Sequence, residues 1–110
     1  MSNSDTKHFD LEELRSNLED DETFVIRYLG LLKNELDTSL LVLKEKFEKQ
    51  DRDGVSSTAH RIKGTALNSC CGELSVLALT LEKTKEFDKE VMGQLIQKIE
   101  SEIALIKTLI

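Results

Sequence analysis

The feature that most constrains the fold is a row of apolar residues repeated every three or four positions between residues 21 and 49. This spacing places the row on one side of an α-helix, because each residue turns the helix by about 100°. Such a helix is stable when its apolar side packs against other apolar surface. The pattern predicts a long helix over 21–49 whose core-facing residues are Val25, Leu29, Leu32, Leu36, Leu40, Leu43 and Phe47.

Stripes with the same spacing predict four further helices, separated by capping residues and glycines. A short helix follows Asp10, which has Glu13 three positions later as in a capping box. A third helix follows the turn "KQDRDG" with Asp51 or Asp53 as its cap, and Gly72 ends or interrupts it. The inward residues of these two helices are Leu11, Leu14 and Leu18, and Val55, Ala59, Ile62, Ala66 and Ser69 or Cys70.

The remaining two helices are expected over about 73–86 and from Asp88 to the end of the chain. Within the long helix, residues 37–39 are weaker helix formers, so both a continuous helix and one with a bend or break at this point are compatible with the sequence. The inward residues of the last two helices are Leu74, Leu77, Ala78 and Leu81, and Met92, Leu95, Ile96, Ile99, Ile103, Ile106, Leu109 and Ile110.

Composition agrees with an all-helical chain. Helix formers dominate its 110 residues, proline is absent and only 5% are aromatic, so the strand and turn signals of a sheet are missing. Striped helices with short connections bury their stripes by packing side by side. We therefore predict an all-α fold, an antiparallel up-down four-helix bundle with a short extra N-terminal helix, over residues 9–110. Residues 1–8 are expected to form a flexible tail.

The formal net charge of −6 disfavours nucleic acid and anionic membranes as partners. No apolar run approaches the roughly 20 residues of a membrane span, and no signal-peptide pattern opens the chain. A cytoplasmic protein is expected. It is also expected to be a monomer, since its helices can close a bundle within one chain.

The two cysteines, Cys70 and Cys71, are adjacent, an arrangement that seldom gives a relaxed disulfide. We interpret them as small packing residues, with a redox role as the alternative. The only histidines are His8 and His60, so no metal site is expected.

The stretch "AHRIKGTA", residues 59–66, holds the strongest candidates for chemistry. His60 lies about 130° from the centre of the third helix's stripe, on the outer surface, and Lys63 is within reach through its i, i+3 relation. Glycine inside a helix costs roughly 0.5–1 kcal/mol, so Gly64 indicates close approach of a partner. The other residues expected to contact that partner are Ser56, Arg61, Leu67 and Cys71.

This arrangement suits the carriage of a phosphoryl group. A neutral imidazole is a good nucleophile near pH 7, since an ordinary histidine side chain has a pKa of about 6.5. A neighbouring ammonium stabilises the added anion, and a bare glycine leaves room for it. Nearby cations outnumber carboxylates, which predicts a locally basic patch for an acidic partner site: Lys49, Arg52, Arg61 and Lys63 against Asp51 and Asp53.

The segment "AHRIKGTA" resembles the signature of histidine-containing phosphotransfer (HPt) domains, in which His-x-x-Lys-Gly precedes two small residues, here Thr65 and Ala66. The order and spacing of the segments "DDETFVIRYLGLLKNEL" and "ELSVLALTLEK" are also similar, so the looser resemblance covers residues 21–109. Many members have a glycine ten residues after the histidine, where this chain has Cys70, and Gly72 follows two positions later.

The resemblance implies that His60 accepts a phosphoryl group through Nε2. It would exchange the group with the aspartate of response-regulator receiver domains or of a hybrid sensor histidine kinase in a phosphorelay. Lys63 would interact with the phosphoryl group, and Gly64 would keep the surface open. No cofactor is implied for this chain, since Mg²⁺ is expected on the receiver. Without a Gly-rich phosphate loop or an ATP-binding domain, a phosphocarrier with no ATP-dependent kinase activity of its own is expected.

Two other interpretations are open. One is a non-catalytic helical interaction or adaptor module in which His60 has no chemical role. The other is the dimerising histidine helix pair of a sensor kinase, which predicts an obligate dimer. A hydrolase or metalloenzyme is disfavoured, because helical spacing places no second reactive group near His60.

Overall fold

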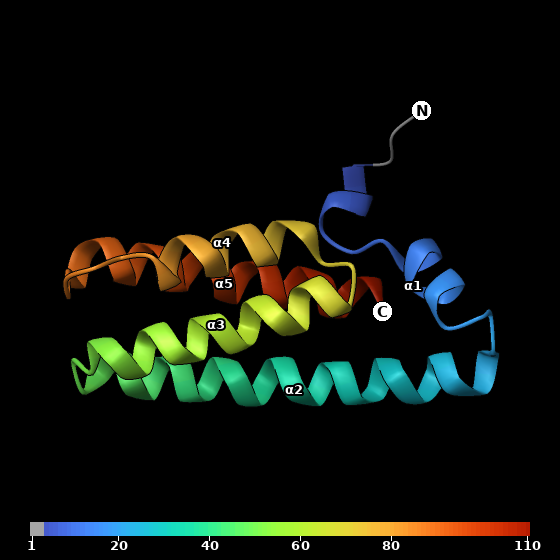
Figure 1. Cartoon of the computed structure of the whole chain (residues 1–110), viewed down its shortest axis with the longest axis horizontal. Helices are drawn as coiled ribbons and strands as arrows, with labels where there is room; N and C mark the ends of the chain where they lie inside the picture. Colours follow the sequence, from blue (N-terminus) through green and yellow to red (C-terminus); the bar gives the residue numbers. More distant parts are fainter. Residues whose placement is uncertain (1–3) are drawn as a thin grey trace.

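The computed structural model describes residues 4–110, and these form an all-helical bundle without strands (Figure 1). A 3-10 helix, η1 (Ser4–Lys7), and a short helix, α1 (Leu11–Asn17), come first. The four longer helices are α2 (Glu22–Glu48), α3 (Arg52–Asn68), α4 (Gly72–Glu82) and α5 (Lys89–Leu109). Consecutive helices from α2 to α5 run in opposite directions, and α5 returns to pack on both α4 and α2. The predicted up-down bundle with an extra N-terminal helix is confirmed.

Aspartates start four of the five α-helices by accepting a hydrogen bond from a backbone N–H of the first turn. Asp10 and Asp88 are the predicted caps of α1 and α5. Of the two candidates for α3, Asp51 is the cap. Asp21 has the same role at the start of α2. The capping residues therefore mark the helix starts to within one residue.

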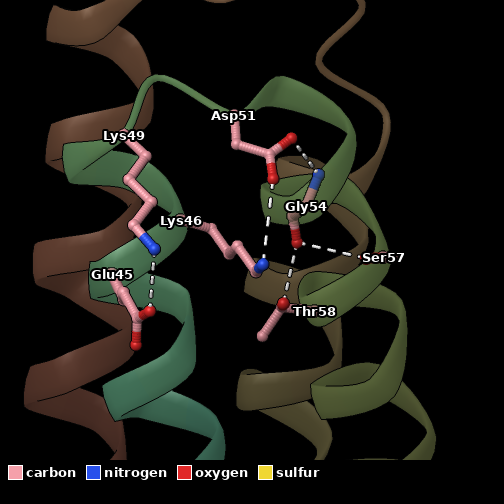
Figure 2. A network of polar contacts seen from close by, with 7 residues as sticks. All are labelled: Glu45, Lys46, Lys49, Asp51, Gly54, Ser57 and Thr58. Atoms are coloured by element: carbon pink, nitrogen blue, oxygen red, sulfur yellow. Dashed lines mark hydrogen bonds and ion pairs between the residues drawn. The ribbon is translucent and has the colours of Figure 1, made fainter.

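The turn between α2 and α3 is held by a polar network (Figure 2). The Asp51 carboxylate accepts from Gly54 N at 2.9 Å and lies 3.9 Å from Lys46 Nζ of α2. The Gly54 carbonyl accepts from the hydroxyls of Ser57 and Thr58 at 3.2 and 2.7 Å. A Cβ at position 54 would collide with the Asp51 carboxylate and the Lys46 side chain, so glycine fits beneath this cap. The network caps the first turn of α3 and connects it to α2 through the Lys46–Asp51 ion pair.

A single core runs through the bundle, and the predicted stripes supply all of it except Phe9 and Cys71. Residues at the edges of the stripes, such as Leu40 and Leu77, are partly buried against it. The buried apolar residues of this core are Phe9, Leu14, Leu32, Leu36, Leu43, Val55, Ala59, Ile62, Ala66, Cys71, Leu74, Ala78, Leu81, Met92, Ile96, Ile99, Ile103 and Ile106.

The structure decides one point that the sequence left open, in α2, and corrects the expected end of α4. α2 continues without a break through residues 37–39, because Leu36, Ser39 and Leu43 are buried together along one side of it. α4 ends at Glu82 and not near residue 86, and the chain then crosses to α5 without regular structure. The last turn of α4 lies beside α3, where the Glu82 carbonyl accepts a hydrogen bond from the Ser56 hydroxyl.

The described part of the N-terminal segment has regular structure and contacts the bundle. Ser4–Lys7 forms η1, and His8 Nδ1 lies 2.6 Å from Glu102 Oε2 of α5. Phe9 is buried, so the segment is anchored on the bundle by apolar packing as well. Residues 1–3 of the predicted tail lie outside the described residues.

The connection between α3 and α4 turns at Cys70, whose φ is 60°. The Cys71 N–H donates to the Ala66 carbonyl at 2.8 Å, which closes the end of α3. This left-handed conformation favours glycine and costs another residue about 1–2 kcal/mol. The resemblance places a glycine at this position in many family members, and the backbone explains why.

Candidate functional site

His60 lies in the middle of α3 on the side away from the core, with its side chain 66% exposed. Its neighbours Ala59 and Ile62 are fully buried, so α3 cannot rotate to hide the imidazole without exposing them. The predicted outward orientation of His60 is confirmed.

The carboxylate of Glu82, the last residue of α4, lies between His60 and Lys63. Its Oε2 is 2.8 Å from His60 Nδ1, and its Oε1 is 2.9 Å from Lys63 Nζ. The Lys63 and Glu82 side chains are each only 23% exposed. The contact with Lys63, and next the hydrogen bond with His60, lower the pKa of Glu82 below its ordinary value. Glu82 is therefore ionised at neutral pH.

The charge of Glu82 decides which nitrogen of the neutral imidazole carries the proton. An ionised carboxylate only accepts hydrogen bonds, so Nδ1 of His60 must be the N–H that donates to Glu82 Oε2. Nε2 then holds the free electron pair. The arrangement presents a nucleophilic nitrogen on a mostly exposed ring.

The surface beside His60 is open and partly apolar. A Cβ added to Gly64 would meet no atom within 4 Å, so packing inside this chain does not require glycine there. Helical side chains lean toward the N-terminus, so a larger residue at position 64 would lie over the preceding turn, which holds His60. Leu67, one turn further on, is exposed. The missing side chain therefore keeps the imidazole accessible from this direction.

The predicted basic patch around His60 is wrong. Each of its four cations has a carboxylate oxygen within 3.1 Å: Lys49 with Glu45, Arg52 with Asp53, Arg61 with Glu35, and Lys63 with Glu82. Counting charges along the sequence misses Glu35 and Glu82, because they come from α2 and α4. These pairs largely neutralise the patch, so a charge-based attraction of partners loses its support.

The residues predicted to contact a partner lie in different environments. Leu67 is exposed, and Arg61 is exposed while its guanidinium makes two hydrogen bonds to the Glu35 carboxylate. Ser56 is half-buried, and its hydroxyl donates to the Glu82 backbone carbonyl at 3.1 Å. The structure therefore leaves Leu67 and Arg61 accessible and gives Ser56 an internal contact.

The placement of Cys71 on this surface is wrong. Cys71 is fully buried in the core, and burial raises the pKa of its thiol to about 12. The helical extrapolation fails because α3 ends at Asn68 and the chain reverses at Cys70. Cys71 is a packing residue, and both cysteines are free thiols.

Glu82 was missed in the sequence, although a signal for it exists. α3 and α4 form an antiparallel helix pair that turns near Cys71. In such a pair, residues equally distant from the turn lie at the same level along the axes. His60 and Glu82 are equally distant from Cys71 in sequence. Counting outward from the turn thus identifies the carboxylate that meets the imidazole.

The two histidines belong to separate sites, since His8 pairs with Glu102 and His60 with Glu82. Within residues 4–110, no group of three or more His, Cys, Asp or Glu side chains is arranged to hold a metal ion. In the same range, none of the helices has both the length and the apolar character needed to span a bilayer.

Comparison with known proteins matches the Hpt domain family to residues 27–108, most of the chain and all of the site. The chain belongs to the Hpt domain family. Its fold is similar to that of the HPT domain from the Hpt sensor hybrid histidine kinase of Shewanella, with a TM-score of 0.66 and 12% sequence identity. That alignment covers 96% of this Hpt domain and 98% of the Shewanella chain. No curated protein sequence matches the chain significantly.

Membership in this family assigns the domain to histidine phosphotransfer in two-component signalling, with receivers or kinases as the class of partner. The adaptor interpretation, in which the histidine has no chemical role, is not favoured. The sensor-kinase helix pair is not favoured either, because α2–α5 close a four-helix bundle within one chain.

Proposed function

We propose that His60 is the phosphoacceptor of this Hpt domain and that its Nε2 exchanges the phosphoryl group with the aspartate of receiver domains. One observation carries the proposal: the exposed imidazole has its Nδ1 held at 2.8 Å by the Glu82 carboxylate. His8 is a poor candidate, because its side chain is only 19% exposed and pairs with Glu102. The labelling experiment and the histidine variants described below decide which of the two histidines accepts the phosphoryl group.

The proposed step begins when the Nε2 electron pair attacks the phosphorus of a receiver's aspartyl phosphate. The Nε2–P bond forms while the bond between phosphorus and the aspartate oxygen breaks, and the aspartate leaves as a carboxylate. The imidazole becomes a cation that keeps its proton on Nδ1. The Glu82 carboxylate lies next to that proton and stabilises the positive charge as it develops. The reverse step uses the same atoms.

Lys63 is proposed to stabilise the transferring phosphoryl group. Its ammonium lies one turn from His60 and 2.9 Å from Glu82 Oε1, so in the resting protein it offsets the charge of that carboxylate. A phosphoryl group on Nε2 adds negative oxygens at the same edge of α3, with which the three N–H donors of the ammonium can also interact. Lys63 thus balances charge in both states.

The outer side of α3 is proposed as the receiver docking surface. Gly64 contributes open space and Leu67 an exposed apolar side chain in the turns that follow His60. Arg61 lies beside them, positioned by Glu35. Because the local ion pairs largely neutralise the surface, shape and apolar contact support docking here more than net charge does.

The test is to incubate the purified domain with receiver domains that have been phosphorylated by acetyl phosphate. We expect a gain of one phosphoryl group per chain, which is stable in base and lost in acid as a phosphohistidine is. The gain is followed by intact mass spectrometry and located by peptide mapping. Failure of every receiver in a broad panel to label the domain, while each labels a known phosphotransfer domain, contradicts the proposal.

Lys63→Ala is predicted to slow phosphoryl transfer by roughly tenfold, equivalent to about 1.4 kcal/mol of transition-state stabilisation. The free energy of unfolding should fall by about 1–2 kcal/mol, because the substitution breaks an ion pair whose two side chains are largely shielded from water. Rapid-quench kinetics with a phosphorylated receiver measure the rate. Lys33→Ala, at an exposed lysine of α2, is the matched control and should transfer at the wild-type rate. Equal rates for both variants would remove Lys63 from the mechanism.

We also propose that the domain acts as a cytoplasmic monomer. The four helices bury one another's apolar stripes within one chain, which supports the monomer. Both cysteines are free thiols, as is usual in a reducing compartment. Sedimentation equilibrium tests the oligomeric state, and a stable dimer at micromolar concentration would contradict it.

A further inference from the structure

The site depends on a carboxylate at a helix terminus, which is a place where helices tend to fray. Glu82 is the last residue of α4, and the carbonyls of a final turn have no partner within their own helix. Unless something else binds those carbonyls, the Glu82 side chain would sample many positions. Its contact with His60 Nδ1 would then be lost for part of the time.

Two side chains of α3 bind the backbone at this terminus. The Ser56 hydroxyl donates to the Glu82 carbonyl at 3.1 Å. The Arg52 guanidinium donates through Nη2 to the Thr84 carbonyl at 3.3 Å. Ser56 and Arg52 precede His60 by four and eight residues. One side of α3 therefore carries the imidazole and also the two side chains that bind the backbone at the end of α4.

Ser56 is the more direct of the two. It binds the carbonyl of Glu82 itself, and it is half-buried between the helices. Arg52 binds two residues further on, and its Nη1 is engaged by the exposed carboxylate of Asp53. The Glu82 side chain contacts α3 at His60 and Lys63. The Ser56 hydroxyl connects the Glu82 backbone to the same helix.

We propose that Ser56 is a positioning residue that anchors the Glu82 backbone, so that the Glu82 carboxylate stays on His60 Nδ1 and Nε2 remains the reactive nitrogen. This inference rests on the proposed function of His60. Ser56 touches neither the imidazole nor the phosphoryl group in this account. It acts through Glu82, and its hydroxyl is already used inside the domain.

The neighbouring residue provides a matched control. Ser57 carries the same hydroxyl, but it donates to the Gly54 carbonyl within α3, as Figure 2 shows. Ser57→Ala therefore removes a hydroxyl from the same helix turn without touching α4. Ser56→Thr keeps the hydroxyl and serves as the conservative rescue.

The experiment measures the tautomer of His60 in uniformly ¹⁵N-labelled protein by long-range ¹H–¹⁵N NMR, at a pH where the imidazole is neutral. Wild type should be mainly the Nδ1–H tautomer. Ser56→Ala should shift the population toward the mixture found in free histidine, and Glu82→Gln should shift it as well. Transfer from a phosphorylated receiver should slow about threefold to tenfold in Ser56→Ala, the range for one lost hydrogen bond. Ser57→Ala and Ser56→Thr should behave as wild type in both assays.

An unchanged His60 tautomer in Ser56→Ala would overturn the inference, as would equal shifts in Ser56→Ala and Ser57→Ala. Matching circular dichroism and thermal midpoints for the two alanine variants separate positioning from general loss of structure. The tautomer is read without any phosphoryl donor, so it tests Ser56 even where the transfer assay fails. A wild-type domain that takes no phosphoryl group would instead contradict the proposed role of His60.

Discussion

A His60→Gln variant is expected to take no phosphoryl group from any phosphorylated receiver, while its helical content and thermal midpoint match wild type. The glutamine amide has no basic nitrogen to attack phosphorus, so the loss should be complete to the detection limit. The side chain at position 60 is mostly exposed, and surface substitutions usually change stability by less than about 0.5 kcal/mol. Acid-labile labelling by mass spectrometry and circular dichroism measure the two properties.

His8→Gln is the matched control, because it replaces the chain's other histidine. It removes the imidazole that pairs with the largely buried Glu102 and should lower the thermal midpoint, yet the domain should still be labelled. The two substitutions thus predict opposite patterns, with labelling lost in one and stability lost in the other. Equal labelling of wild type and His60→Gln would contradict the assignment of the acceptor.

Gly64→Leu is expected to slow transfer by at least about tenfold, or about 1.4 kcal/mol, while making the domain more stable. The new side chain would lean toward the N-terminus of α3 and cover His60. Nothing inside the chain opposes it, since a Cβ at this position has no neighbour within 4 Å. Removing a mid-helix glycine should therefore raise the free energy of unfolding by about 0.5–1 kcal/mol. Rapid-quench transfer kinetics and urea unfolding measure the two effects.

The control for this variant is Gly30→Leu. Gly30 lies inside α2, and its added Cβ would also meet nothing within 4 Å, so a similar gain in stability is expected. Transfer should stay at the wild-type rate, because α2 and α3 run antiparallel about the turn near Gln50, which places Gly30 level with the end of α3 and about ten residues along the axis from His60. Wild-type transfer by Gly64→Leu would show that the open surface has no part in the reaction. Unfolding of Gly64→Leu would make Gly64 a packing residue.

The helices and the core were predictable because their causes are local in sequence. The stripe of α2 and the caps at Asp10, Asp51 and Asp88 depend on residues within a turn or two of one another. The same is true of the outward direction of His60, which follows from the buried positions on its own helix. These features can therefore be predicted from the 3.6-residue spacing of apolar residues along each helix.

The rest of the site depends on contacts between helices. Glu82 lies on a different helix from His60, and the ion pair of Arg61 with Glu35 also crosses between helices. Cys71 was misplaced because one left-handed residue ended the helical period before it. The errors at the site arise where a property of α3 is set by a neighbouring helix or by the end of α3 itself.

The most direct test of the central claim is to identify the nitrogen that carries the phosphoryl group. ¹⁵N-labelled domain is phosphorylated by a receiver, and NMR locates the histidine nitrogen coupled to ³¹P. We predict phosphorus on Nε2 of His60, with the proton of Nδ1 retained beside Glu82. Phosphorus on Nδ1 of His60, or on either nitrogen of His8, would contradict the account.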